Sequence, residues 1–411
     1  MKIRRTPIPA ALAALSLFAP GASADTTGDH RVLVILASWG PQPWPAEDVR
    51  RVVFDEANAF LRRSSFGQLS LHGDVTPWLP AYPQRPACPV PTHERVAPGL
   101  SDGPLEAARS AGYSPAAYDR VVYVVPRTEC DWNAVGVGRE VLLNGMLSAW
   151  LVVHELGHTY GLAHARGATC MGGVCRPHEY GDPFSPMGRG LIDFSAYEKL
   201  TMGWIQDVVR TERTGSYRIG RPDVRSAPPH ALVVATGSGE YWFEQRLDVD
   251  PSGLAVRVVE PDVPDDDLAP PTRFQHDPTH TGNDVVRAGE VFRSSGAFSV
   301  RYTPLADGNA DLQFAWIDRV RPSRPVLVAP ARNVRAARPF RVAWRTGDGG
   351  SGVASCTVTL DRRVIARATG EAAAGLVVPG VRPGLHQLSV TCTDRAGNVS
   401  AAGLRRVRVV P

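Results

Sequence analysis

The chain has 411 residues, of which 43% are hydrophobic and 21% charged, so it is long enough for two or three domains with real cores. Its 39 glycines and 36 prolines favour many turns and short strands. The formal net charge of +4 includes Lys2, Arg4 and Arg5 in the first 24 residues, so the rest of the chain is nearly neutral. We therefore expect no nucleic-acid partner and no anionic-membrane partner.

The N-terminus has three zones in the order of a secretory signal peptide. Basic residues come first, an apolar stretch runs over 8–18, and Ala22-Ser23-Ala24 forms a cleavage site. A transit peptide is the alternative, disfavoured by the lack of amphipathic arginine spacing. No later run approaches the ~18 apolar residues of a membrane span. We expect a secreted protein, extracellular or periplasmic, without a membrane span.

The first part of the remaining chain alternates strand and helix patterns. Strands are predicted from buried or alternating apolar runs, and helices from apolar residues at helical spacing. In chain order they are a strand at 31–37, a helix at 46–63, a strand at 69–75, a short helix at 105–111, a strand at 120–125 and a helix at 147–160. This order predicts an α/β domain.

After Trp204 helical periodicity disappears and short strand-like runs are separated by Pro, Gly and Asp. The predicted strands cover 231–235, 241–246, 254–259, 298–302 and 312–316. We interpret 209–321 as an all-β domain. The acidic segment Asp262–Asp267 is interpreted as a solvated loop; a calcium site is the alternative, but the spaced ligands of a calcium loop are missing, and whether Ca²⁺ binds stays open.

A linker at 322–324 leads into about seven short strands that extend to the C-terminus. Their spacing predicts a β-sandwich over 324–411. The segments Gly349–Val353 and Asp394–Asn398 resemble those of immunoglobulin-like or fibronectin-like modules in secreted bacterial enzymes. A bond between Cys356 and Cys392 would join neighbouring strands of one sheet.

The sequence His154-Glu155-Leu156-Gly157-His158 lies on the predicted helix at 147–160. Positions i and i+4 share a helix face, so both imidazoles can reach one metal ion. Glu155 points about 100° away from His154, where its carboxylate can lie beside a water molecule. Gly161 allows a left-handed turn that can bring His164 back as a third ligand, with one position left open.

Three readings compete for this pattern. A short HExxH match alone is often a solvent-exposed helix, but the extension to His164 makes chance improbable. A purely structural zinc normally has four protein ligands, which disfavours that reading. A secreted adhesin or binding protein on a catalytically dead scaffold is the alternative function, and the intact Glu155 argues against it.

The extended pattern resembles that of the metzincin zinc endopeptidases, in which a methionine turn lies beneath the metal. Met187, in Ser185-Pro186-Met187-Gly188, is the candidate for this turn. Ala165 and Arg189 do not match the marker residues of the better-known metzincin groups. Four other segments resemble gametolysin-type peptidases: 65–69, 179–188, 194–204 and 240–246.

The resemblance implies one catalytic Zn²⁺ held by His154, His158 and His164, with Glu155 as general base and then general acid. It also implies a protein or peptide substrate. Tyr180 and Arg189 are candidates for a second donor to the oxyanion. Asp182 either orients a ligand imidazole or, as we favour, caps the turn before Pro183.

Six cysteines in an exported chain predict three disulfides. Cys170 and Cys175 can close a small loop; zinc binding together with His178 is the disfavoured alternative. Cys356 pairs with Cys392. Cys88 and Cys130 then pair by elimination, although one of them could instead be a latency thiol on the zinc, as in matrixins.

These observations predict an α/β metzincin-like zinc peptidase domain, an all-β domain and a C-terminal immunoglobulin-like β-sandwich. The boundaries are 1–24 for the signal peptide, 25–208 for the catalytic domain, 209–321 for the β-rich domain and 324–411 for the C-terminal module. The predicted activity is zinc-dependent hydrolysis of peptide bonds in proteins.

Overall fold

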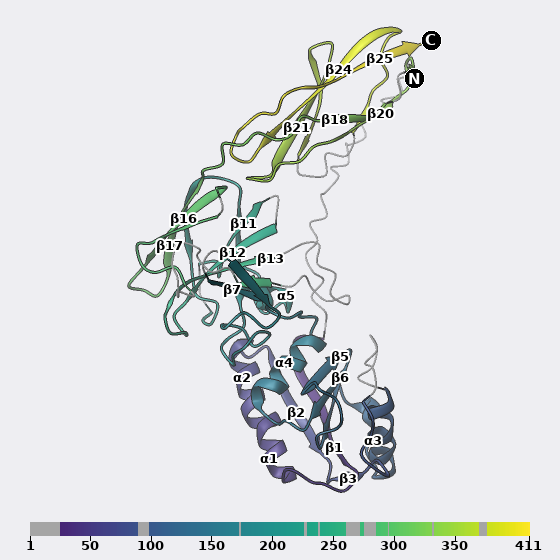
Figure 1. Cartoon of the computed structure of the whole chain (residues 1–411), viewed down its shortest axis with the longest axis vertical. Coiled ribbons are helices and arrows are strands. Elements are labelled where there is room, and N and C mark those ends of the chain that lie inside the picture. The colour runs from purple at the N-terminus through teal and green to yellow at the C-terminus, as the bar shows by residue number, and fades with distance from the viewer. Residues whose placement is uncertain are drawn as a thin grey trace, which may run out of the picture.

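The computed structural model describes residues 25–88, 98–171, 174–225, 228–236, 239–259, 272–274, 285–294, 296–330, 333–369 and 376–411. The predicted signal peptide and the segment Asp262–Asp267 lie outside these residues. The described elements are mostly strands, and they form three groups that follow one another along the long axis of the molecule (Figure 1). The expectation of a β-rich chain with several separate sheets is thus confirmed. No helix of the described part is long and apolar enough to cross a membrane.

The first group contains one mixed sheet with helices on both sides. Its strands are β1 (Gly28–Ser38), β2 (Leu69–Val75), β3 (Leu79–Pro80), β4 (Arg120–Val125), β5 (Ala134–Val137) and β6 (Glu140–Asn144). Its helical elements are α1 (Ala46–Arg50), a π-helical segment (Arg51–Ala57), α2 (Asn58–Ser64), α3 (Pro98–Ser110), a short 3₁₀ turn (Pro115–Ala117) and α4 (Ala149–Thr159). The strand order is β2-β1-β4-β6-β5, with β3 beside the end of β1. Only β5, at the edge, runs antiparallel to its neighbour.

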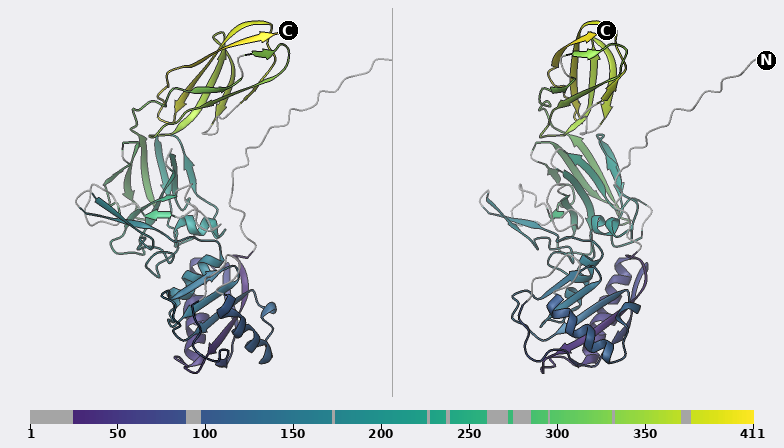
Figure 2. Two further views of the ribbon diagram at one scale, coloured as in Figure 1. Left: turned by 45° about the vertical axis from the view of Figure 1, so that its right-hand side comes forward. Right: turned by 90° about the vertical axis from the view of Figure 1, so that its right-hand side faces the viewer.

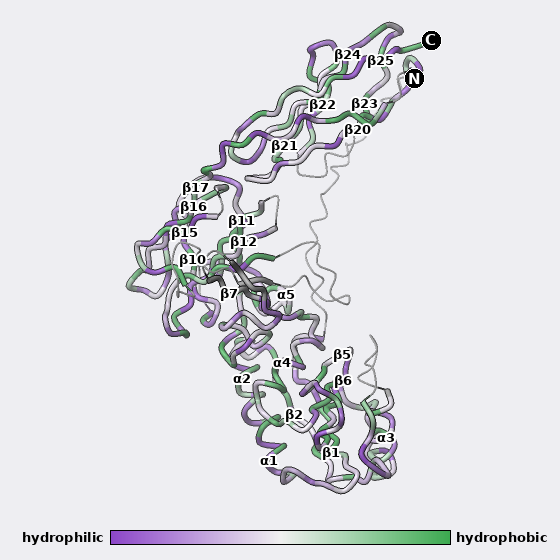
Figure 3. The backbone as a smooth tube through the Cα atoms, in the orientation of Figure 1, coloured by the Kyte–Doolittle hydropathy of each residue, from purple (hydrophilic) through white to green (hydrophobic). Residues whose placement is uncertain are grey.

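The central strand β1 is buried on both faces, which explains its continuous apolar run. Val32 and Val34 point into the cluster formed with α2 and α4, whereas Leu33 and Ile35 point into the cluster formed with α3. Hydrophobic residues accordingly gather along β1 and α4 (Figure 3). The sheet therefore carries α4 on one face and α3 on the other.

Most predicted elements of this group are confirmed, with two differences. The helix expected at 105–111 begins at Pro98, because Leu100 and Ala108 pack together against β1 as one amphipathic face. The strands β3, β5 and β6 were not predicted. They are short, and half-buried glycine and polar positions weaken the alternation of β5 and β6.

The second group is a pair of sheets with a hairpin and a helix on one side. Its elements are β7 (Gly167–Met171), β8 (Val174–His178), α5 (Ala196–Thr201), β9 (Val209–Thr211), β10 (Gly215–Ile219), β11 (Leu232–Thr236), β12 (Gly239–Arg246), β13 (Gly253–Val259), β14 (Thr272–Phe274), β15 (Val291–Arg293), β16 (Phe298–Pro304) and β17 (Ala310–Trp316). The sheets β14-β13-β12-β11-β9 and β10-β17-β16-β15 share one hydrophobic cluster, to which Phe243 and Phe298 belong. On the far side of β12, Trp242 packs with Ala196 of α5.

The third group is a two-sheet sandwich built from eight described strands. They are β18 (Val326–Ala329), β19 (Asn333–Arg335), β20 (Phe340–Arg345), β21 (Val353–Leu360), β22 (Arg363–Thr369), β23 (Leu376–Val378), β24 (Gly384–Asp394) and β25 (Gly403–Val410). The sheets β18-β20-β23 and β19-β25-β24-β21-β22 close over a common core that contains Trp344, Val358 and Val390. Figure 2 shows this module at the end of the molecule opposite the first group.

The junction between the second and third groups is formed by polar contacts. The Asp318 carboxylate accepts hydrogen bonds from the backbone and the hydroxyl of Ser351, both at 2.8 Å. The Asn398 side chain donates to the Asp318 carbonyl at 3.2 Å, and Arg395 pairs with Glu212 at 3.0 Å. The C-terminal module is therefore held by specific hydrogen bonds at its base.

Candidate metal centre

Three imidazoles converge at the C-terminal end of α4. Ser148 caps the helix by accepting a hydrogen bond from Leu151, and the helix places His154 and His158 one turn apart. Gly161 then adopts a φ of 87°, the left-handed turn expected from the sequence, and the chain returns with His164. The Nε2 atom of His158 lies 3.2 Å from that of His154 and 3.1 Å from that of His164.

This spacing fits a single metal ion. Two imidazole nitrogens that each lie ~2.0–2.1 Å from a tetrahedral zinc ion are about 3.3 Å apart. Within the described residues, the group of His, Cys, Asp and Glu side chains that gathers here consists of these three histidines. A tetrahedral ion bound by them would keep one position for water or substrate.

The other nitrogen of each ring has its own acceptor. His154 Nδ1 donates to the Pro186 carbonyl and His158 Nδ1 to the Leu162 carbonyl, both at 2.8 Å. His164 Nδ1 instead contacts the Glu179 carboxylate at 2.7 Å. These acceptors fix the proton on Nδ1, so each Nε2 presents a lone pair to the common centre.

Burial keeps the helix histidines neutral. It lowers the pKa of His154 to about 4 and that of His158 to about 3. Neighbouring imidazoles add to this effect, because a second positive charge at this distance is unfavourable. At neutral pH both rings are therefore in the protonation state that a metal ligand needs.

The side chain of Glu155 extends from α4 toward the edge strand β5. Its side chain is 4% exposed, and its carboxylate accepts a hydrogen bond from the backbone of Gly136. Burial raises the pKa of Glu155 to about 8 despite that hydrogen bond. A Cβ atom on Gly136 would lie 2.2 Å from the Glu155 carbonyl oxygen, so only glycine lets β5 approach the helix this closely.

Met187 lies beneath the histidines and is fully buried. A Cβ atom on Gly157 would lie 2.4 Å from its sulfur, so the glycine in the middle of α4 makes room for the methionine. The Ala165 N–H donates to the Met187 carbonyl at 2.9 Å, and Gly188 donates to Ser185 at 3.0 Å in a tight turn. The methionine turn is thereby tied to the residue that follows the third histidine.

The remaining candidates differ in position. The Tyr180 ring lies 4.3 Å from that of His164, between ring centroids, and Tyr180 is 42% exposed. Arg189 is exposed. Asp182 Oδ1 accepts from the Phe184 N–H at 2.8 Å, which is the turn cap, and its carboxylate also pairs with Arg257. The alternative role of Asp182 as partner of a ligand imidazole is wrong, because Pro186, Leu162 and Glu179 fill those places.

A buried cluster of charges joins the loop beneath the histidines to the second group, and the sequence did not indicate it. Arg257 on β13 pairs with Asp182 and with Glu244 of β12. Arg246 of β12 donates to the carbonyls of Phe184 at 3.0 Å and Asp193 at 2.9 Å. Charged residues inside apolar strands were the available signal, but their partners in the loop lie 53 to 75 residues away in the chain.

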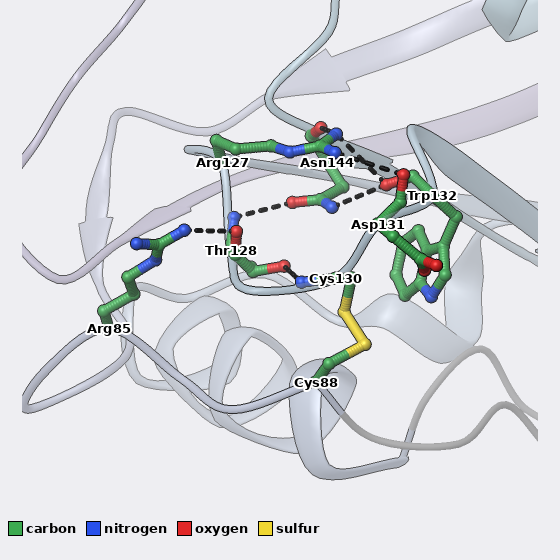
Figure 4. The surroundings of a disulfide bond; sticks show 8 residues. All are labelled: Arg85, Cys88, Arg127, Thr128, Cys130, Asp131, Trp132 and Asn144. Atoms are coloured by element: carbon green, nitrogen blue, oxygen red, sulfur yellow. Dashed lines mark hydrogen bonds between the residues drawn. A yellow bond between two sulfur atoms is a disulfide. The ribbon is translucent and has the colours of Figure 1, made fainter.

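The cysteines form two described disulfides. Cys88 bonds Cys130 and thereby ties the segment before α3 to the loop that enters β5 (Figure 4). Because both sulfurs are bonded, the latency-thiol alternative is wrong. Cys356 and Cys392 bond across neighbouring strands β21 and β24 of one sheet.

The predicted pair Cys170–Cys175 falls on residues whose side chains lie outside the described part. The backbone places Cys170 opposite Cys175 in the hairpin formed by β7 and β8. The pairing of these two sulfurs therefore stays a prediction.

Comparison with known families identifies the segment that carries this centre. Residues 100–231 match the sequence model of the gametolysin peptidase M11 family. The match supports a gametolysin-type peptidase. The matched segment contains α4, His164 and Met187, and the match supports a metallopeptidase at the level of the family. The gametolysin-type segment ends before β12 and β13, whose charged residues hold its loop.

Other comparisons give weaker likenesses. No curated protein matches the chain. Fibronectin(III)-like modules of Clostridium thermocellum CbhA share 22% identity over 21% of this chain and 94% of that chain, with a TM-score of 0.19. The PKD1 domain of the Vibrio cholerae metalloprotease PrtV shares 14% over 22% and 100%, with a TM-score of 0.17. These TM-scores are too low to establish a common fold.

Proposed function

We propose that this chain is a secreted zinc-dependent endopeptidase with a metzincin-like catalytic domain. The observation that carries the proposal is the convergence of three Nε2 lone pairs beside a buried carboxylate, in a gametolysin-type segment. We assign 25–208 to the catalytic domain, 209–321 to a β-rich domain and 324–411 to an immunoglobulin-like module. Ala22-Ser23-Ala24 supports export after cleavage of the signal peptide.

In this proposal each residue has a defined task. His154, His158 and His164 hold the ion. Bound zinc supplies a Lewis acid that polarises the scissile carbonyl and lowers the pKa of a water molecule toward ~7. Glu155 takes a proton from the attacking water and delivers it to the leaving amine, so that one carboxylate acts first as base and then as acid.

The protonation behaviour of Glu155 supports this role. A pKa of about 8 in the metal-free chain leaves the carboxyl mostly protonated at pH 7, and a cation held by the histidines would lower this pKa toward the range of a general base. Proton transfer is most effective when the catalytic pKa lies close to the working pH. The Gly136 backbone fixes the carboxylate, so its position does not depend on side-chain contacts. Tyr180, beside His164 and partly exposed, is our candidate for a second donor to the substrate oxyanion.

The replacement Glu155→Gln tests the assignment, because it keeps the volume and removes only the base. We expect about one zinc per chain in both proteins, and turnover of an unfolded protein substrate at least ~10²-fold lower in the variant. The control is Glu47→Gln, which changes a carboxylate on α1 far from the centre. Metal analysis that finds no transition metal in the active protein, or near-normal turnover of Glu155→Gln, contradicts the proposal. Stable binding of a protein without turnover in the wild type would favour the adhesin alternative.

A further inference from the structure

The formal charge of the chain is divided unequally along its length. Residues 324–411 contain 14 arginines, no lysine and four acidic residues, a formal net charge of +10. Residues 25–323 contain 28 basic and 37 acidic residues, a net charge of −9. The near-neutral average from which we expected no anionic partner is thus the sum of an acidic part and a strongly basic C-terminal module.

Most of these arginines face solvent, and no acidic partner for them is found among the described residues. Eleven are exposed: Arg324, Arg335, Arg338, Arg341, Arg345, Arg362, Arg363, Arg367, Arg382, Arg406 and Arg408. In the described part of the module, the ion pair formed by an arginine is that of Arg395 with Glu212. The positive charge is therefore available to a partner.

The strand register places four of the exposed arginines on one surface. Val407 and Val409 of β25 are buried, so the alternating residues Arg406 and Arg408 point outward from the five-stranded sheet. Arg335 of β19 stands opposite Val410, which shares this outward side. Arg367 of β22 is outward at the other edge of the sheet.

Hydroxyl and amide side chains lie between these arginines, together with two exposed leucines, Leu385 opposite Arg408 and Leu404 opposite Ser389. The outward positions of β24 and β21 hold Gln387, Ser389, Thr391, Thr357 and Thr359. The five strands contain one acidic residue, Asp394, which is 2% exposed. We call this outward side, with Arg335, Arg367, Arg406 and Arg408, the arginine face. A surface hollow where β25 meets β18 is lined by Arg406, Arg408, Leu385 and Leu404 together with Arg324 and Val326.

The residue types on the arginine face indicate which class of anionic polymer it can bind. Phe340 and Trp344 are the module's only Phe, Tyr or Trp residues, one half-buried and one buried, so the face has no aromatic platform for stacking bases. A flat sheet does not enter a DNA groove as a helix or a two-stranded ribbon does. Guanidinium groups bind carboxylates with paired hydrogen bonds, and Ser, Thr and Gln side chains match sugar hydroxyls.

We propose that the arginine face of the C-terminal module binds a linear acidic polysaccharide. The partner is recognised through its repeated carboxylates by the arginines and through its hydroxyls by the polar strip between them. The inference does not depend on the proposed peptidase activity, because the face lies on a different part of the chain from the metal centre.

Binding of the full-length protein to polygalacturonate, with neutral dextran as a control polymer, tests this proposal. We expect binding to polygalacturonate that weakens as salt rises to ~0.15 M, and none to dextran. The triple variant Arg335→Ser, Arg406→Ser, Arg408→Ser should bind about 10-fold more weakly or worse. The matched control Arg338→Ser, Arg341→Ser, Arg345→Ser removes the same charge away from the face, and it should stay close to the wild type.

Each other result overturns the proposal. Equal losses in the two triple variants would show that net charge alone attracts the polymer. Tighter binding to duplex DNA or to phosphatidylglycerol vesicles would identify another class of partner, and self-association lost in the first variant would identify a second copy of the chain. Circular dichroism spectra and thermal unfolding measured in parallel should be the same in all three proteins, which shows that the module is folded and keeps this test separate from that of the proposed function.

Discussion

At the scale of single residues, the three histidines are held in two different ways. Two of them use backbone carbonyls, which the helix end and the methionine turn fix in place. His164 uses the carboxylate of Glu179, whose side chain is 59% exposed. The third histidine therefore depends on a side chain that can be exchanged without disturbing the fold.

Removal of that carboxylate by Glu179→Ala should weaken zinc binding by ~10- to 100-fold, because the imidazole loses the partner that fixes its proton and orientation. Glu179→Gln, which keeps an acceptor without the charge, should lose less. Competition between the protein and a zinc chelator measures the affinity, and Glu47→Ala is the control. Unchanged affinity in Glu179→Ala would show that the contact does not position His164.

The histidines of the centre could be predicted from the sequence, whereas one of their partners could not. The spacing of His154, His158 and His164 determines that they can meet, because helix geometry and one glycine turn are local properties. Glu179 lies in the segment 179–188, which resembles gametolysin-type peptidases. Its contact with His164, however, depends on how the hairpin formed by β7 and β8 folds back. Local patterns cannot supply that geometry.

At the scale of elements, the loop that carries Met187 is held from the second group. Arg246 and Arg257 bind Asp182 and the carbonyls around it from the outer side of β12 and β13. The other side of the same strands packs in the hydrophobic core between the two sheets of the second group. The two strands therefore contact the loop on one side and this core on the other. The strands themselves were predictable from their apolar runs, but the ion pairs were not, because their partners are far apart in sequence.

The variant Arg257→Met should lower the free energy of unfolding by about 3–5 kcal/mol, since it leaves the buried Asp182 without its cation and Glu244 with Arg246 alone. The matched change Arg293→Met, at an exposed position of β15, should cost little. Chemical denaturation of both variants gives the comparison. A loss below about 1 kcal/mol for Arg257→Met would mean that the cluster contributes little to the fold.

The same cluster sets an expected pH dependence. Burial alone would raise the pKa of Glu244, but Arg257 and Arg246 outweigh it and hold the pKa below its ordinary value. Its contribution is therefore complete above the unfolded pKa of ~4.3 and is lost as pH falls through the lower folded pKa. The contribution of this cluster to the free energy of unfolding should be level from about pH 5 upward and fall below about pH 4. The stability difference between the wild type and Arg257→Met should narrow in that acidic range.

In the whole molecule, the C-terminal module is a structural unit separate from the one that contains the metal centre. The module has its own core and its own disulfide, and it meets the second group through polar contacts at Asp318 and Glu212. None of its described carboxylates or imidazoles joins the three histidines. The sandwich was predictable from strand spacing. Which arginines share a face of it could be known only from the register of the strands.

A chain that ends at Arg321 should therefore retain zinc and its turnover of short soluble peptides. If the module is an anchor, the truncated chain should lose activity on protein that is embedded in or attached to an insoluble matrix. If the module is a spacer, activity on both the soluble peptides and the insoluble protein should be unchanged. Parallel assays on both substrates distinguish the two roles. Loss of peptide turnover in a zinc-loaded truncated protein would contradict the independence of the two parts.

The in-line order of the three groups has a mechanical consequence. The first group and the C-terminal module occupy opposite ends of an elongated molecule (Figure 2). If the C-terminal module holds the proposed peptidase to a surface, the rest of the molecule can pivot about that attachment, and the histidine centre then lies at a distance from the surface. Peptide bonds at that distance would be cut first, and those directly beside the attachment would be spared.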